Sequence, residues 1–238
     1  MDVFRRKEIK FIINATQRQA LEAVLLQRMV PDKHGRSTIC NLYYDTPDFR
    51  LIRHSLERPV YKEKLRLRSY GLAKEDTDVF LEMKKKYKGV VYKRRIPISE
   101  PEAFAFMERI APLPKDSQIG REMVYFRDFY RDLAPRMYIC YDREAWYDPN
   151  DGGFRVTMDQ SIRFRTADLS LSLPPEGQEI LPPDLSVLEV KAEGGIPMWM
   201  TEFLSQHQIR KQSFSKYGRA FQQLLQKHLE ESRGTTYA

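Results

Sequence analysis

The chain has 238 residues, of which 42% are hydrophobic and 31% are charged, and its formal net charge is +7. This composition excludes a globally disordered protein, because it supplies enough apolar side chain for a substantial core beside a strongly charged surface or cavity. The excess of lysine and arginine favours an anionic partner, such as nucleic acid, acidic lipid headgroups, a nucleotide or a phosphate polymer, without choosing among them.

Cysteine content and hydropathy indicate a cellular compartment. The two cysteines, Cys40 and Cys140, match no metal-ligand spacing, and a reducing cytosol is the simpler setting for them. The first residues lack the apolar run of a signal peptide, and no stretch of about 18 apolar residues follows. We expect a soluble, cytoplasmic protein with no membrane span of its own; attachment to a membrane through an anchored partner subunit stays open.

The first half of the chain predicts strands separated by short helices. Residues 3–13 predict a strand, and Asn14 or Thr16 can cap a helix that reaches about residue 29. Beyond that helix, strand patterns occur at 38–46, 60–70, 79–87 and 90–98, with a polar helical turn at 47–56 and a hairpin turn at Lys88–Gly89.

The second half predicts more helix. Ser99 and Glu102 are spaced to cap a helix, a second helix is expected at 119–132, and strands are expected at 137–148, 154–165 and 186–193, with an irregular loop at 166–186. Pro197 and Ser213 open two further helices, the latter ending near residue 230. We therefore expect about eight strands and four or five helices in one domain over residues 1–230, followed by a disordered tail at 231–238.

Charged side chains share one face of nearly every predicted strand, because residues i and i+2 point the same way. These residues are Glu8 and Lys10; Lys64, Arg66 and Arg68; Glu82, Lys84 and Lys86; Lys93 and Arg95; Arg143; Arg155, Thr157 and Asp159; and Glu189, Lys191 and Glu193. For any one strand, a solvated outer face explains the pattern. Taken together, the strands favour an anion site, because like charges on adjacent strands repel unless something negative lies across them.

The ligand that best suits such faces is a chain of phosphates. If the faces converge inside a closed barrel, roughly ten cations require a hydrated cavity and a polyanion, because burying one unpaired cation costs several kcal/mol. The minority carboxylates Glu8, Glu82, Glu189 and Glu193 would repel phosphate directly, but carboxylate oxygens suit Mg²⁺ or Mn²⁺. An ion pair with a neighbouring lysine is the alternative for each of these glutamates.

Seven segments, in this order, resemble the VTC domain, the polyphosphate polymerase domain of the vacuolar transporter chaperone complex. They are RRKEIKF, KLRLRSYG, VFLEMKKK, YDREAW, FRVTMDQSIR, LEVKAE and SFSKYGRAF, and they extend from about residue 4 to residue 222. That domain belongs to the triphosphate tunnel metalloenzyme superfamily. The resemblance implies an α+β fold in which an eight-stranded antiparallel β-barrel forms a tunnel wrapped by helices. It also implies transfer of the ATP γ-phosphate to a growing polyphosphate chain with Mn²⁺ or Mg²⁺.

The resemblance also implies roles for particular residues. Phosphate-binding tunnel cations are matched by Lys10, Arg66, Arg68, Lys84, Lys93, Arg143, Arg155 and Lys216, with Lys191 added from the same strand face as Glu189. Glu189 matches the metal-binding acid, and Glu8 and Glu82 are further metal candidates. We expect Arg66, Arg68, Lys84, Arg143 and Glu189 to be the catalytic set. Ser213 stands where the family often has a basic residue, and the phosphate-sensing SPX domain and membrane helices of the eukaryotic complex are not in this sequence.

Other functions remain in competition. The same site would be a metal-dependent triphosphatase if water replaced the polyphosphate acceptor, or a binding module if it captured polyphosphate or nucleotide without turnover. Nucleic-acid binding is supported by charge and by 12% aromatic residues, but by no recognisable nucleic-acid-binding motif, so it is not favoured. No P-loop sequence and no nucleophile-elbow sequence occurs.

Overall fold

A computed structural model describes residues 7–75 and 77–234, which divide into two compact units, each assembled from three stretches of sequence. Unit 1 comprises the described residues of Met1–Thr38, Tyr141–Ile162 and Leu181–Ser215. Unit 2 comprises those of Ile39–Cys140, Arg163–Ile180 and Lys216–Ala238. Three of the five boundaries, at 38/39, 140/141 and 162/163, fall within strands, and the single domain expected over residues 1–230 stays a prediction.

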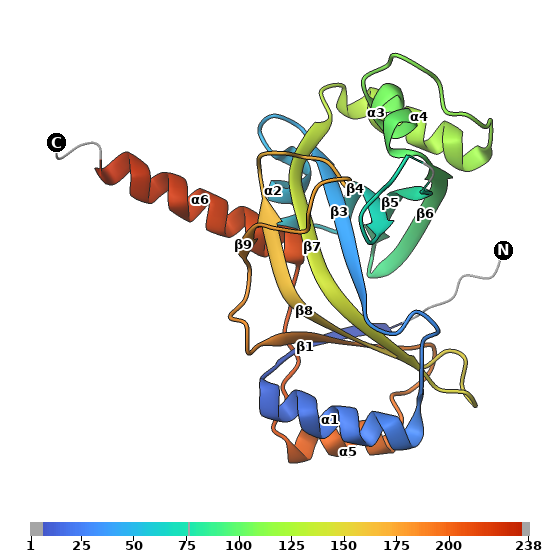
Figure 1. The fold of residues 1–238 in the computed structure, drawn as a ribbon, viewed down its shortest axis with the longest axis vertical. Helices are drawn as coiled ribbons and strands as arrows, with labels where there is room; N and C mark the ends of the chain where they lie inside the picture. Colours follow the sequence, from blue (N-terminus) through green and yellow to red (C-terminus); the bar gives the residue numbers. More distant parts are fainter. Residues whose placement is uncertain (1–6, 76, 235–238) are drawn as a thin grey trace. The chain divides into compact units, whose positions relative to one another are not determined.

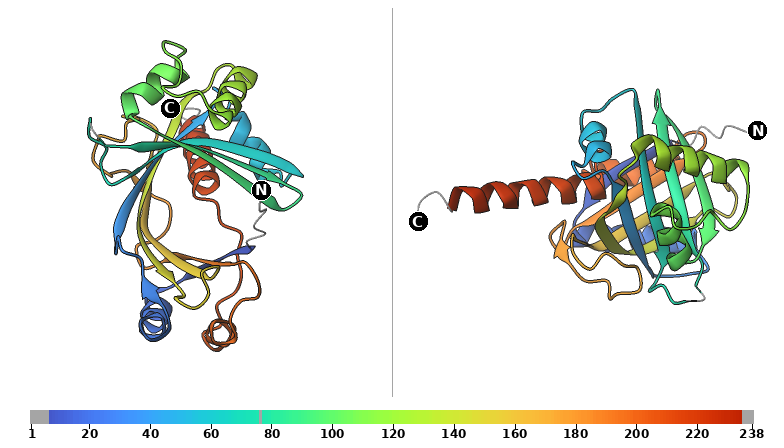
Figure 2. Two further views of the ribbon diagram at one scale, coloured as in Figure 1. Left: turned by 90° about the vertical axis from the view of Figure 1, so that its right-hand side faces the viewer. Right: turned by 90° about the horizontal axis from the view of Figure 1, so that it is seen from above.

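Unit 1 is a sheet with two helices on one face (Figures 1 and 2). Strand β1 (Lys7–Ile13) pairs antiparallel with β10 (Ser186–Ala192), and β10 pairs antiparallel with β8 (Arg155–Arg165). The second part of β7 (Ala134–Tyr147) follows in the order, and the short β2 (Val30–Pro31) pairs with it. Helix α1 (Ala15–Arg28) starts with a capping box between Asn14 and Gln17, as expected from Asn14, and α5 (Met198–Gln206) follows Pro197.

The helices of unit 1 cover the apolar face of its strands. Leu21 and Leu25 from α1 and Met200 and Phe203 from α5 form one core with alternate strand residues, namely Phe11, Val156, Met158, Leu188 and Val190. Because strand side chains alternate between faces, the intervening residues of these strands point to the opposite side of the sheet. Lys10 and Glu189 therefore lie on the face away from α1 and α5.

Unit 2 contains the other half of the sheet. The first part of β7 is followed by β3 (Ser37–Asp45), β4 (Tyr61–Tyr70), β5 (Val79–Tyr87) and β6 (Val90–Ile98). The pairs β3–β4, β4–β5 and β5–β6 are antiparallel. The short β9 (Gln178–Glu179) pairs with the end of β8. The helices are α2 (Arg50–Leu56), α3 (Glu100–Met107), α4 (Gln118–Tyr130) and α6 (Lys216–Gly234).

Leucines of β4 and β5 lie under the helices of unit 2. Leu65, Leu67, Leu81 and Met83 are buried in one core with side chains from α3 and α4, including Phe106 and Phe126. In the segment KLRLRSYG the leucines therefore pack under helices, while Arg66 and Arg68 point to the other face. The pattern matches that of unit 1.

The complete strand order is β1-β10-β8-β7-β3-β4-β5-β6. The predicted α+β class with eight main antiparallel strands is confirmed; the described residues add two strands of two residues each and have six helices instead of four or five. Strand β1 begins at Lys7, and residues 3–6 of the predicted strand lie outside the described part. One of the added strands, β9, lies in the predicted irregular loop.

Two helix boundaries differ from expectation. Helix α6 begins at Lys216 instead of Ser213, because Phe214 is buried in an extended segment before the first turn, and it continues to Gly234 instead of ending near residue 230. Ser99 and Glu102 form the expected capping box of α3. No helix among the described residues is long and apolar enough to cross a membrane.

Candidate functional site

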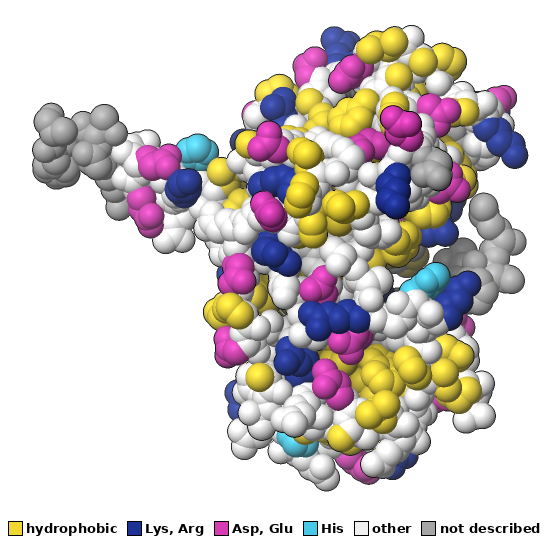
Figure 3. All heavy atoms as spheres, in the orientation of Figure 1, with side chains coloured by type: hydrophobic (Ala, Val, Ile, Leu, Met, Phe, Trp, Pro, Cys, Tyr) yellow, Lys and Arg dark blue, Asp and Glu magenta, His cyan; other side chains and the backbone are white. Residues whose placement is uncertain are grey.

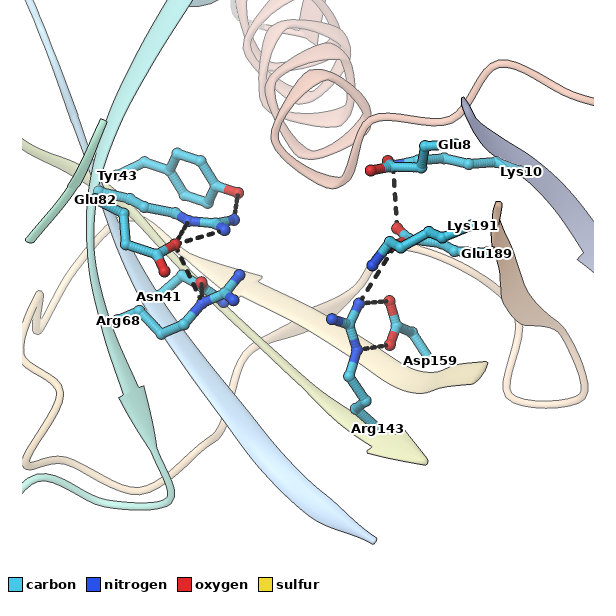
Figure 4. Close-up of polar contacts among 11 residues, drawn as sticks. Glu8, Lys10, Asn41, Tyr43, Arg68, Glu82, Arg143, Asp159, Glu189 and Lys191 are labelled. Carbon is cyan, nitrogen blue, oxygen red and sulfur yellow. Dashed lines mark hydrogen bonds and ion pairs between the residues drawn. The ribbon is translucent and has the colours of Figure 1, made fainter. Parts of the chain in front are cut away.

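Exposed charges of both signs are interspersed on the molecular face drawn in Figure 3. Charges on the strand faces are arranged differently. Each unit has a buried glutamate that three cations surround, and Figure 4 shows the side chains of both groups apart from Lys93. We call them the Glu82 cluster (Asn41, Tyr43, Arg66, Arg68, Glu82, Lys93) and the Glu189 cluster (Glu8, Lys10, Arg143, Asp159, Glu189, Lys191).

The Glu82 cluster is built by strand register in unit 2. Arg66 of β4 is the cross-strand partner of Glu82 in β5, and its Nε and Nη2 donate to Glu82 Oε2 at 3.0 and 2.8 Å. Lys93 Nζ lies 2.6 Å from Glu82 Oε1, and Arg68 Nε lies 3.6 Å from Oε2. Since Glu82 is only 2% exposed, a single buried carboxylate orders all three cations.

The charges of this cluster do not balance. Burial acts to raise the pKa of Glu82, but Arg66, Arg68 and Lys93 outweigh it and lower that pKa to about 2. The pKa of Lys93 is itself lowered, first by burial and then by repulsion from the two arginines, against the attraction of Glu82. Within this group of side chains, three cations share one carboxylate, so the formal charge of the group is plus two.

Neutral side chains of β3 hold the two arginines in place. Arg68 Nε donates to Asn41 Oδ1 at 3.0 Å, and Arg66 Nη1 donates to the Tyr43 hydroxyl at 3.1 Å. The Tyr43 ring stacks on the Tyr217 ring of α6, with 4.5 Å between centroids. The first turn of α6 thus supports the arginine side of the cluster.

Asp45 holds the Tyr217 side chain in place. Its carboxylate accepts a hydrogen bond from the Tyr217 hydroxyl at 2.8 Å and from the backbone N–H groups of Thr46, Leu51 and Ile52. Burial raises the pKa of Asp45, and these hydrogen bonds partly oppose the rise. Burial, followed by the nearby Asp45 carboxylate, raises the pKa of Tyr217, so the phenol stays a donor.

The Glu189 cluster is built by register in unit 1. Glu189 of β10 is the cross-strand partner of Lys10 in β1, and Lys10 Nζ lies 3.0 Å from Glu189 Oε1 and 3.2 Å from Glu8 Oε1. Lys191 Nζ and Arg143 Nη2 lie 3.4 and 3.7 Å from Glu189 Oε2. Arg143 also forms a two-pronged pair with the fully buried Asp159, at 2.6 and 2.7 Å.

Here the charges balance. Burial acts to lower the pKa of Lys10, but Glu189 and Glu8 outweigh it and raise that pKa. Burial likewise opposes the charge of Arg143, and Asp159 more than compensates, so the pKa of Arg143 is raised. Three carboxylates meet three cations in this cluster, which leaves no formal surplus.

The carboxylates of the Glu189 cluster fit a hard divalent cation in one respect. Glu8 and Glu189 converge on the same ammonium group, and Mg²⁺ is commonly bound by one or two carboxylates together with substrate phosphates. Within the part of the chain that the structure describes, no three His, Cys, Asp or Glu side chains are grouped to hold a metal. These residues therefore suit an ion that phosphate oxygens help to coordinate.

The remaining predicted site residues are Lys84, Arg155 and Lys216. Lys84 of β5 is exposed and lies opposite Lys64 and Lys93 in the register, which makes a row of three lysines. Arg155 is opposite Lys191 in the register but pairs with Asp32 at 3.2 Å, and its side chain is nearly half exposed. Lys216 is the first residue of α6, beside Tyr217.

The sequence pattern did not identify the neutral and acidic side chains that pair with the arginines of the two clusters. Tyr43 is buried, as an aromatic strand residue usually is, and its hydroxyl accepts a hydrogen bond from Arg66. A signal was present, since Asn41, Tyr43 and Asp45 alternate along β3 and share a polar face. Asp159 was noted on a charged strand face, yet its pairing with Arg143 depends on how β7 and β8 lie together.

Comparisons with known proteins place this geometry in context. The family model described as the VTC domain matches residues 5–225. Subunit 4 of the vacuolar transporter chaperone complex of Schizosaccharomyces pombe is 23% identical over 224 residues, a match that covers 76% of this chain and 31% of that protein. The chain thus spans about a third of that relative's length.

Two solved structures share the fold. A putative adenylate cyclase from Bacillus halodurans matches with a TM-score of 0.54 and 15% identity, over 88% of this chain and 95% of the other. A putative adenylyl cyclase from Hippeastrum, described as having a dominant triphosphatase activity, matches with a TM-score of 0.51 and 17% identity, over 90% and 94%. At these identities the likeness confirms the predicted fold class.

Proposed function

Because this chain belongs to the VTC domain family, we propose that it is a metal-dependent phosphotransferase that adds the γ-phosphate of ATP to a growing polyphosphate chain. The observation that carries the proposal is the Glu82 cluster, in which one buried carboxylate brings three cations together on one face of neighbouring strands. At a coarser level, family and fold support a polyphosphate-related or triphosphate-hydrolysing enzyme.

Phosphoryl transfer requires positioning and charge neutralisation more than a covalent nucleophile. In the proposed site, Arg66 and Arg68 bind triphosphate oxygens through their planar guanidinium groups, whose angle Tyr43 and Asn41 set. Lys84 and Arg143 complete the proposed triphosphate contacts. Lys10, Lys93, Arg155, Lys191 and Lys216 are proposed to bind the polyphosphate chain as mobile or peripheral charges.

Glu189 and Glu8 are the proposed ligands of Mn²⁺ or Mg²⁺, which when bound would neutralise phosphate oxygens. Lys10 bridges both carboxylates, so it holds them together before an ion arrives. For Glu82, the alternative role of ion-pair partner is favoured, because the Glu82 cluster contains a single carboxylate, whereas Glu189 shares Lys10 with the second carboxylate Glu8. The terminal phosphate of the acceptor would attack the γ-phosphorus in line, with ADP as the leaving group.

Product analysis tests the proposal. The chain is incubated with ATP and Mn²⁺, polymer is stained on a gel, and free phosphate is assayed in parallel. We expect polymer from the wild type, none from Arg66→Glu, and polymer from the control Arg121→Glu, whose side chain is exposed and pairs with Asp116. Free phosphate without polymer would make the chain a triphosphatase, and neither product would contradict both activities.

Ligand competition tests whether the site prefers phosphate chains. A ligand at about 100 times its Kd stabilises the folded form by about 2.7 kcal/mol, so tripolyphosphate should raise the thermal midpoint of the wild type but not of Arg66→Glu. An oligonucleotide of equal charge should compete poorly. If the oligonucleotide competes equally well, the specificity proposed here is wrong; if tripolyphosphate binds without turnover, the chain is a polyphosphate-binding module.

Cellular context is proposed by similarity. The Schizosaccharomyces pombe relative is described as a subunit of a complex, so we propose that this chain acts in the cytoplasm and associates with a membrane-anchored partner subunit. Chemical crosslinking in cells followed by mass spectrometry of the tagged chain would identify such a partner. Recovery of the chain alone would contradict this part of the proposal.

A further inference from the structure

Unit 2 contains a cavity that none of the predicted site residues line. It has a volume of about 470 Å³ and lies between α2 and α4, over the start of β4 (helices in Figure 2). Its lining combines aromatic rings, cations and one buried carboxylate, among them Tyr125, Phe129, Arg50, Lys62 and Glu63. The volume falls within the range of about 300–1,000 Å³ that small-molecule sites occupy.

Glu63 is the most deeply buried acid of this cavity. It is 8% exposed, and its carboxylate accepts hydrogen bonds from the Tyr61 and Tyr130 hydroxyls at 2.5 and 2.6 Å. Burial, and then Glu63 itself, raises the pKa of both tyrosines, so both remain donors. An ionised carboxylate has about four acceptor positions, so two hydroxyls leave capacity for a donor from a ligand.

Two solvent-exposed aromatic rings of α4 line one side of the cavity. Tyr125 and Phe129 stack at 6.1 Å with 24° between their planes, yet they are 67% and 53% exposed. The Arg50 guanidinium lies over the Phe129 and Tyr130 rings, at 5.9 and 5.4 Å from their centroids. Exposed rings beside a cation are the elements that bind a flat, anionic ligand such as a nucleotide.

The cations of the cavity would gain from an anion. Lys62 is the cross-strand partner of Lys86, so two like charges lie opposite each other, and Lys62 Nζ donates to the Ser55 carbonyl at 3.2 Å. Burial lowers the pKa of Lys62, and repulsion from Lys86 and Arg58 lowers it further. Like-charge pairs across strands are destabilising, and a bound phosphate would reverse that effect.

We propose that this cavity is a second nucleotide-binding site, separate from both charge clusters, for a nucleotide whose base bears an amino group. The base stacks on Phe129 and Tyr125, its amino group donates to Glu63, and its phosphate lies toward Arg50 and Lys62. The site binds but does not transfer phosphate, and it offers a place at which nucleotide level can regulate the enzyme. It shares no residue with the proposed tunnel site.

Calorimetric titration of the whole chain with adenosine 5′-monophosphate tests this inference, with tripolyphosphate at saturation to occupy the charge clusters. We expect binding to persist, and Phe129→Ala to weaken it by about five- to 150-fold, the range for loss of one stacked base. Tyr92→Ala, which removes an exposed ring outside the cavity, should leave the affinity unchanged. Purine riboside 5′-monophosphate, which lacks the amino group, should bind at least about tenfold more weakly.

Three results would overturn the proposal: no heat of binding at millimolar nucleotide, an unchanged affinity in Phe129→Ala, or equal binding of the two nucleotides. Phe129→Leu keeps apolar volume but removes the ring, so its loss of affinity separates stacking from general packing. Circular dichroism on each variant checks that the chain is folded. Because tripolyphosphate occupies the proposed catalytic site throughout, these results are independent of whether that site makes or hydrolyses polyphosphate.

Discussion

The Glu82 cluster of unit 2 and the Glu189 cluster of unit 1 share one arrangement but differ in formal charge. Each centres on a buried glutamate within 3.7 Å of three cations. In unit 1, Glu8 and Asp159 add two carboxylates, so that the formal charges within the cluster cancel, whereas the Glu82 cluster has a formal charge of plus two. The comparison shows that strand faces with similar sets of cations can differ in how many carboxylates accompany them.

The largest effect is expected from Glu82→Gln. Three cations would then face one another without a carboxylate, and removing one partner of a buried charge group costs about 3–5 kcal/mol of folding free energy. Urea unfolding measures the change, and added tripolyphosphate should restore more stability to the variant than to the wild type. Asp116→Asn, at an exposed ion pair, is the matched control and should change nothing measurable. Equal stability of Glu82→Gln and wild type would contradict the claim that Glu82 stabilises the fold by compensating these three cations.

Lowering the pH should destabilise unit 2, because it protonates Glu82. Glu82 has a pKa lowered from 4.5 to about 2, so it contributes stability that is complete above pH 4.5 and is lost as the pH falls through about 2. At about 1.4 kcal/mol per pKa unit, the wild type should lose roughly 2–3 kcal/mol between pH 5 and pH 2.5 that Glu82→Gln does not lose. Parallel urea titrations at several pH values measure the difference; curves that stay parallel would contradict the role given to Glu82.

Glu189→Gln should cost less stability, because Glu8 and Asp159 still accompany the three cations of unit 1. We expect a loss of about 1.5–3 kcal/mol, as for a hydrogen bond to a charged group. Its stronger effect should be on metal dependence, with a higher Mn²⁺ concentration needed for half-maximal activity than in the wild type. A stability loss larger than that of Glu82→Gln would reverse the ranking of the two clusters.

The smallest effect is expected from Tyr217→Phe, which keeps the stacking on Tyr43 but removes the hydrogen bond to Asp45. Three backbone N–H groups still satisfy Asp45, so the cost should be about 1 kcal/mol. Urea unfolding measures it, and tripolyphosphate affinity reports whether Arg66 stays in position. Tyr217→Ala, which also removes the ring, should weaken that affinity further, and identical affinities in both variants would show that stacking does not support Arg66.

Much of the fold was predictable because its signals are local. Capping residues such as Asn14 and Ser99, and the alternation of leucine with arginine in β4, specify elements and faces without distant contacts. Helix α6 was placed three residues too early, since burial of Phe214 is a tertiary effect that no capping pattern reveals. The strand β9 was missed because two residues carry no periodicity.

The candidate site was predictable in its cations more than in their partners. Arg66, Arg68 and Arg143 share strand faces with other charges, and that pattern is visible in the sequence. The hydroxyl of Tyr43 and the carboxylate of Asp159 were not assigned to the site, because a tyrosine in a strand is usually a packing residue and an aspartate on a charged face has several possible partners.

By itself the sequence determined which residues form strands and which face of each strand is charged, because a period of two is a property of the extended backbone. Only the tertiary structure decided which carboxylate each cation meets. Lys10 and Glu189 are neighbours because β1 pairs with β10, although 179 positions separate them in the chain. Strand order and register depend on the packing of all the elements together. They decide which cations and carboxylates meet in each cluster, and therefore the formal charge of each cluster.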